Sequence, residues 1–116
     1  MTLSNKNTKL TINDIGGYIA KEDERYTVKD NPHLKNLMLS STFLFANKET
    51  SGHTHDGQEE IYFFVKGHGE MTLDDDRFPV EEGDVVVIED GVFHQVHNTG
   101  HLGLYFVCVF DGGRNH

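Results

Sequence analysis

Short apolar runs recur at regular intervals from residue 37 onward, and turn residues separate them. The runs expected to form strands cover residues 37–45, 60–66, 70–73, 77–80, 85–88, 92–97 and 104–110. Gly-containing or acidic turns lie between them, and Pro79 indicates an edge or strand-end position for its run. This rhythm is typical of an antiparallel barrel or sandwich.

The chain before residue 37 shows no sustained period of 3.6 or 2. Its first seven residues are mostly polar. Residues 9–12 are compatible with a short edge strand, and residues 13–35 contain a charged run and the turn signal Asp30-Asn31-Pro32. We expect at most one helical turn in 13–35. The predicted organisation is an N-terminal extension with a short strand (1–36), a barrel (37–111) and a flexible tail (112–116).

Composition supports one all-β domain. The chain has 116 residues, 36% of them apolar, with 12 Gly, 2 Pro and no Trp, which favours many short strands joined by Gly turns. A net charge of −9 disfavours nucleic acid and anionic membranes as partners. The longest apolar runs are too short to span a bilayer, and no secretory signal is evident, so we expect a soluble, cytoplasmic protein.

The single cysteine, Cys108, cannot form an internal disulfide. It lies in the apolar run 104–110, where it is most simply a small buried side chain. A thiol lining a cavity is the alternative, because strand parity alone does not fix which face looks inward.

Two histidines and a carboxylate stand just ahead of the run at 60–66. His53 and His55 are two residues apart and share a face of an extended chain, and a short Gly-containing loop lets Glu60 join them. His94 is a fourth candidate further on. Imidazole and carboxylate suit first-row divalent metals, so the pattern predicts a metal site of three His and one Glu.

The two segments resemble the two signature motifs of the cupin superfamily. The first motif is Gly, five residues, His-x-His, three or four residues, Glu, six residues and Gly. His53, His55, Glu60 and Gly67 match it. Asn47 stands at the leading Gly, and we interpret Gly52 as supplying that turn.

The second motif is Gly, five residues, Pro-x-Gly, two residues, His, three residues and Asn. Gly83, Gly91, His94 and Asn98 match it, while Glu89 replaces the Pro. The resemblance implies a double-stranded β-helix, or jelly-roll, barrel with a metal at its mouth. The ligands that it implies are His53, His55, Glu60 and His94.

Other polar residues near these motifs have simpler interpretations. Tyr62 and Phe64 share parity with Glu60 and should face inward; Phe64 is expected in the core, whereas the Tyr62 hydroxyl is a weak catalytic candidate that would orient or protonate a ligand. Glu59 should face outward. His97 should lie on the opposite face of its strand from His94, as a surface or interface residue.

Two classes of function fit these residues. Three His and one Glu leave open coordination positions on Mn, Fe, Ni, Cu or Zn, which would serve a small metalloenzyme of the isomerase or oxygenase type acting on a small polar molecule. The alternative is a non-catalytic sensor or binding module for a sugar or another small polar ligand. The alternative to a metal site is a barrel that has lost its metal, but such cupins usually lose a ligand. Between the two classes of function, we favour the enzyme.

We also expect a homodimer, because runs 37–45 and 104–110 present more apolar surface than one small barrel can bury.

Overall fold

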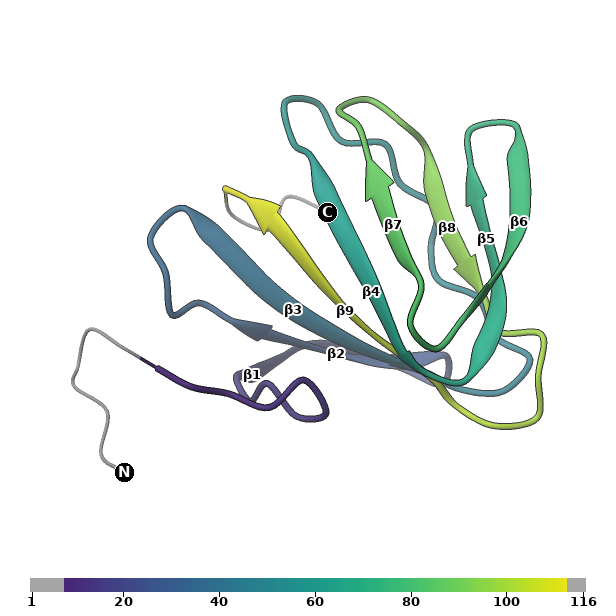
Figure 1. Cartoon of the computed structure of the whole chain (residues 1–116), viewed down its shortest axis with the longest axis horizontal. Helices are drawn as coiled ribbons and strands as arrows, with labels where there is room; N and C mark the ends of the chain where they lie inside the picture. The colour runs from purple at the N-terminus through teal and green to yellow at the C-terminus, as the bar shows by residue number, and fades with distance from the viewer. Residues whose placement is uncertain (1–7, 113–116) are drawn as a thin grey trace.

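A computed structural model describes residues 8–112, which form nine strands in two antiparallel sheets (Figure 1). The strands are β1 (Tyr18–Glu22), β2 (Tyr26–Asn31), β3 (Leu37–Leu44), β4 (Glu60–Lys66), β5 (His68–Leu73), β6 (Asp76–Glu81), β7 (Val85–Ile88), β8 (His94–His97) and β9 (Leu104–Asp111). No helix in this part of the chain is long and apolar enough to cross a membrane.

The larger sheet has the order β1-β2-β3-β9-β4-β7, and the smaller has the order β6-β5-β8. They face each other as the two sides of an open barrel (Figure 1). The all-β prediction is confirmed, and every strand expected from residue 37 onward is present. β6 is an edge strand, as Pro79 had indicated.

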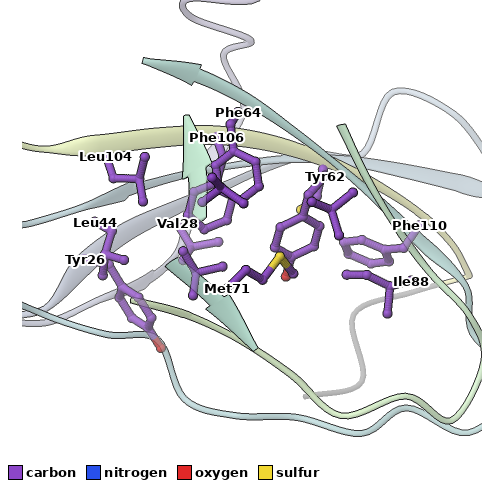
Figure 2. Close-up of a cluster of buried hydrophobic side chains, with 14 residues drawn as sticks. Tyr26, Val28, Leu44, Tyr62, Phe64, Met71, Ile88, Leu104, Phe106 and Phe110 are labelled. Atoms are coloured by element: carbon purple, nitrogen blue, oxygen red, sulfur yellow. The ribbon is translucent and has the colours of Figure 1, made fainter. Parts of the chain in front are cut away.

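The core lies between the two sheets. Along β4 the exposure alternates, with Glu60, Tyr62 and Phe64 facing inward, as period-2 geometry requires. Figure 2 shows aromatic side chains of β4 and β9 gathered with Met71 of β5 and Ile88 of β7. The ring of Phe106 packs against Tyr62 and Phe64, at centroid distances of 5.2 and 5.3 Å. This aromatic layer packs beside the polar cluster that contains Glu60 and His94.

No strand was expected in residues 13–35, but β1 and β2 lie there. β2 pairs with β3 along its whole length, from Tyr26 opposite Leu44 to Asn31 opposite Leu39. Residues 9–12 form no strand and make only an isolated bridge between Thr11 and Asp14. Pairing with a distant strand, rather than local pattern, defines this part of the fold. The polar residues 1–7 and most of the expected tail, 113–116, lie outside the described residues.

The continuous apolar run 85–88 is buried on one face only. β7 is an edge strand of the larger sheet, and its outward residues Val85 and Val87 are 55% and 66% exposed. Val86 and Ile88 face the core. A continuous apolar run therefore does not imply burial of both faces at the edge of a sheet.

Candidate metal centre

His53 and His94 lie directly opposite each other on adjacent segments. The amide of His53 donates to the carbonyl of His94 at 3.1 Å, and the amide of His94 donates to the carbonyl of His53 at 2.9 Å. Residues that exchange both hydrogen bonds in an antiparallel pair present their side chains on the same face. The backbone therefore brings these two imidazoles, 41 positions apart in the sequence, to one place.

Glu60 and His55 complete the cluster from the start of β4 and the loop before it. Glu60 pairs with Ile88 of β7 and Phe110 of β9, so its backbone is held on both sides. Its Oε1 lies 3.0 Å from Nε2 of His55 and 3.5 Å from Nε2 of His94. All three side chains are buried.

The donor atoms of His55, Glu60 and His94 all lie within 4.8 Å of one another, an arrangement that can hold a metal ion. His53 is outside this trio. Its ring centroid lies 5.7 Å from that of His55 and 6.1 Å from that of His94. The structure thus brings three of the four predicted ligands together and places the fourth at the border of the cluster.

The hydrogen bond of His94 fixes where its lone pair points. Its Nδ1 lies 3.2 Å from the carbonyl oxygen of Val92, so Nδ1 carries the proton and donates, and Nε2 presents a lone pair. Burial lowers the pKa of His94; the Val92 carbonyl opposes this effect and nearby His55 adds to it. A neutral Nε2 therefore faces a carboxylate oxygen in a buried site.

Two lone pairs that face each other do not bond, and a cation between them would satisfy both. Imidazole nitrogen and carboxylate oxygen are the donor types that divalent transition metals accept. The donor set present therefore fits a metal ion, which would be held by His55, Glu60 and His94, with His53 as the expected fourth ligand.

Tyr62 lies against this cluster on its inner side. Its ring stacks on Phe106 and meets the ring of His94 edge-on, with centroids 5.9 Å apart and an interplanar angle of 79°. Its inward orientation agrees with the parity argument, and so does the exposure of Glu59. The catalytic role of Tyr62 stays a prediction.

A cavity of about 40 Å³ opens beside the cluster, between the two sheets. Its lining combines His53, Glu60, Tyr62 and His94 with the apolar rings of Phe106 and Phe110. Cys108 also lines it, so the inner face is the one that carries the thiol. A water molecule needs roughly 10–15 Å³, so the cavity has room for a ligand of only a few non-hydrogen atoms.

Sequence patterns did not identify the polar residues on the far side of this cavity. These are Lys21 from β1 and Ser40 and Thr42 from β3; Thr50, from the loop before His53, also lines the cavity. A short signal was present, because Tyr26 and Val28 alternate with Thr27 and Lys29 in β2. The neighbouring charged run concealed it.

His97 lies on the opposite face from His94, as expected, but it is buried rather than at the surface. Its Nδ1 lies 2.8 Å from Oε2 of Glu49, and its Nε2 lies 2.9 Å from Oγ1 of Thr72. The loop that carries Glu49 covers it. His68, the first residue of β5, and His101 are exposed.

The turn role assigned to Gly52 belongs instead to Asn47. Asn47 has a φ of 61°, which Asn tolerates better than most residues. Gly52 has no positive φ, and a Cβ on it would lie 2.2 Å from Cζ of Phe93. Gly52 is therefore needed for close packing, and Asn47 supplies the left-handed conformation.

Several known proteins are similar to this chain. An uncharacterized protein of Methanocaldococcus jannaschii is 30% identical over 94 residues, covering 72% of this chain and 75% of that protein. An oxalate-binding protein of Thermotoga maritima is 30% identical over 81 residues, covering 70% and 67%. A glucose-6-phosphate isomerase of Thermococcus gammatolerans is 25% identical, covering 90% and 69%.

Solved structures agree with the architecture. A predicted oxalate decarboxylase of Thermotoga maritima superposes with a TM-score of 0.68 at 25% identity, covering 74% of this chain and 79% of that one. KdgF from a Halomonas species gives a TM-score of 0.74 at 18% identity, covering 84% and 89%, and so supports the fold alone. A sequence model of the Cupin domain matches residues 42–110, which include all four predicted ligands. The chain therefore belongs to the cupin family.

Proposed function

We propose that this chain binds one divalent transition metal ion through His53, His55, Glu60 and His94 and uses it to act on a small polar molecule. The observation that carries this proposal is that Nε2 of His94 lies 3.5 Å from a carboxylate oxygen of Glu60, with both side chains buried. A bound Mn, Fe, Ni, Cu or Zn ion would supply a Lewis acid or, as iron, an oxygen-activating centre. The protein residues would hold that ion at the inner end of the cavity.

Metal analysis of protein purified without a chelating tag tests the site. We expect close to one transition metal ion per chain, and a large loss in a Glu60→Gln variant that keeps the side-chain shape. Equal metal content in the wild type and the variant would overturn the ligand assignment.

Within this proposal we favour a small metalloenzyme of the isomerase or oxygenase type. Phe106 and Phe110 would exclude water from the ligand, and Tyr62, whose ring touches His94, would orient it or donate a proton. The cavity volume favours a ligand of a few atoms over a sugar phosphate. Oxygen-uptake, sugar-isomerisation and oxalate-consumption assays on metal-loaded protein would identify the reaction.

A non-catalytic binding module is the second candidate. This candidate is supported by the similarity to the oxalate-binding protein of Thermotoga maritima, which is 30% identical to this chain. Oxalate that is bound by metal-loaded protein and recovered unchanged, with no activity in the three assays, would favour this candidate.

We also propose a homodimer in which a second copy covers the outer face of the larger sheet. Part of this face is already covered by the chain itself, since the Tyr105 hydroxyl donates to the carbonyl of Ile12 and the nearby Ile15 is buried. The uncovered part lies on β4 and β7, where Ile61, Val85 and Val87 are neighbours in the sheet and exposed. Light scattering should give twice the chain mass at micromolar concentration. A Val87→Lys variant should give the monomer mass, whereas a monomeric wild type would refute the proposal.

A further inference from the structure

Lys21 belongs to the same cavity as the predicted metal ligands, although it lies on the edge strand β1. It is partly buried. Among the described residues that line the cavity, it is the only Lys or Arg. The family match begins at residue 42, so β1 is outside the matched region.

A β-bulge accounts for the direction of Lys21. Tyr18 pairs with Asp30 and Ile19 with Lys29, but the next pair is Lys21 with Val28, so Ala20 is an extra residue in β1. Val28 is buried in the core, and paired residues share a face of the sheet. Lys21 is therefore on the inner face. Bulges often redirect a side chain next to a functional site.

The remaining lining residues include groups that can hydrogen-bond a polar ligand. Ser40, Thr42 and Thr50 contribute hydroxyl groups, and the other lining residues are aromatic, are Val28 and Cys108, or belong to the metal cluster. With a net charge of −9, the protein as a whole repels anions. An ammonium group in the lining of the cavity would offset this repulsion locally.

We propose that Lys21 anchors the carboxylate of a small organic anion, so that the metal and the ammonium group bind opposite ends of one ligand. This inference rests on the proposed metal site and specifies its ligand class as small mono- or dicarboxylates. Lys21 is a specificity-determining residue in this scheme and is not a metal ligand.

A structural role for Lys21 is the alternative. Asp30, on the neighbouring strand, is fully buried, and Lys21 would then serve as its counter-charge in the fold. A substitution that removes the charge of Lys21 distinguishes the two roles, because each role predicts a change in a different measured quantity. A structural role predicts lower thermal stability with unchanged ligand affinity, whereas an anchoring role predicts weaker binding of anions only.

The test compares Lys21→Met with Lys29→Met, a matched variant on the outer face of the adjacent strand. Each protein is loaded with Mn²⁺, its metal content is measured, and oxalate and the neutral analogue oxamide are titrated by calorimetry. We expect unchanged metal content in both variants and oxalate binding about 10- to 100-fold weaker in Lys21→Met, as for the loss of one hydrogen bond to a charged group. Lys29→Met should bind like the wild type, and oxamide should not distinguish the three proteins.

A Lys21→Arg variant keeps the charge and should retain most of the oxalate affinity, so the test stands even if Lys21→Met folds poorly. Metal-loaded wild type that binds neither oxalate nor glyoxylate would overturn the proposal, as would equal oxalate affinity in wild type and Lys21→Met. Loss of metal from the wild type itself would instead contradict the proposed metal site, which keeps the two failures distinct.

Discussion

The two sides of the cavity are built differently. The metal side consists of β8, the start of β4 and the loop that carries His53 and His55, and backbone hydrogen bonds join these parts. Besides the reciprocal His53–His94 pair, the amide of Thr50 donates to the carbonyl of Val96 at 2.9 Å, and the amide of Asn98 donates to the carbonyl of Lys48 at 2.8 Å. The opposite side includes β1, an edge strand that pairs only with β2 and contains a bulge.

This difference separates two tasks of the site. The proposed metal position depends on a segment held by backbone hydrogen bonds, where a small displacement would weaken every proposed metal–ligand bond. The contact with the rest of the ligand depends on an edge strand, where a change of side chain or register leaves the metal side intact. The predictions below, taken with the Lys21 test, measure how independent the two sides are.

Removing a predicted ligand should have the largest effect. Changes in residues that only support metal ligands typically cost 10- to 100-fold in affinity, so His94→Ala and His55→Ala should each weaken metal binding by more than about 100-fold. His53→Ala should cost less, because His53 lies outside the tight trio. Competition with a fluorescent chelator measures these affinities, and the exposed His101→Ala serves as control. Similar losses in His101→Ala would contradict the assignment.

Acid should remove the stability that the metal contributes. The folded-state pKa of His94 is lowered from 6.5 by burial, and metal binding would lower it further by requiring the neutral imidazole. A lowered histidine pKa gives stability that is present above pH 6.5 and is lost as pH falls below that value, because the unfolded chain then binds more protons. At metal concentrations 100 to 1,000 times the dissociation constant, the loss should approach about 3–4 kcal/mol.

Thermal unfolding of metal-loaded and metal-free protein between pH 7.5 and 5 measures this effect. Metal-free protein should lose less stability, since only burial then lowers the His94 pKa. Parallel curves for the two forms would show that the histidines are not ligands.

Gly17→Ala should disturb the far side alone. Gly17 has a φ of 95°, and a Cβ on it would lie 2.2 Å from the backbone oxygen of Asp30; Gly16, with a φ of 71°, has no atom within 4 Å of such a Cβ. Both substitutions carry backbone strain, but only Gly17→Ala adds a clash. We expect it to lower the free energy of unfolding by about 1–3 kcal/mol more than Gly16→Ala. Metal affinity should be the same in both variants, and a tenfold loss in Gly17→Ala would show that the two sides are coupled.

Glu49→Gln should have the smallest effect. Its carboxylate lies 2.8 Å from Nδ1 of His97, but the side chain is 61% exposed. Exposed ion pairs contribute about 1 kcal/mol or less, so urea unfolding should change by no more than that. A larger loss would indicate that this contact, rather than the backbone hydrogen bonds, holds the loop before His53.

Much of the metal side was predictable from sequence because most of its residues lie close together in the chain. His53 and His55 are two residues apart, Glu60 begins a strongly β-forming run, and spacing alone assigns them to one face. What spacing did not provide was the direction of the His94 lone pair, which depends on the Val92 carbonyl. The four-ligand set therefore remains a proposal, with three members brought together by the structure.

The far side was not predictable because the orientation of its side chains depends on how β1 and β2 pair with other strands. Lys21 follows Ala20 in a run that is otherwise charged, and only pairing with Val28 reveals the bulge that turns it inward. Asp30 belonged to an apparent turn signal, yet it is fully buried opposite Ser40 of β3. A charged residue inside a barrel contradicts the usual hydrophobic pattern. The sequence pattern therefore did not identify Lys21 or Asp30 as inward-facing residues.

The reciprocal hydrogen bonds between His53 and His94 have a kinetic consequence. Neither backbone segment can move away from the other without breaking both hydrogen bonds. A coordinated ion could therefore not leave by movement of one of these segments alone. Its escape would require the segment around residues 50–55 to detach from β8, a local opening of the kind that amide hydrogen exchange detects. Metal exchange should consequently be slow, and its rate should follow the exchange rates of the His53 and His94 amide protons.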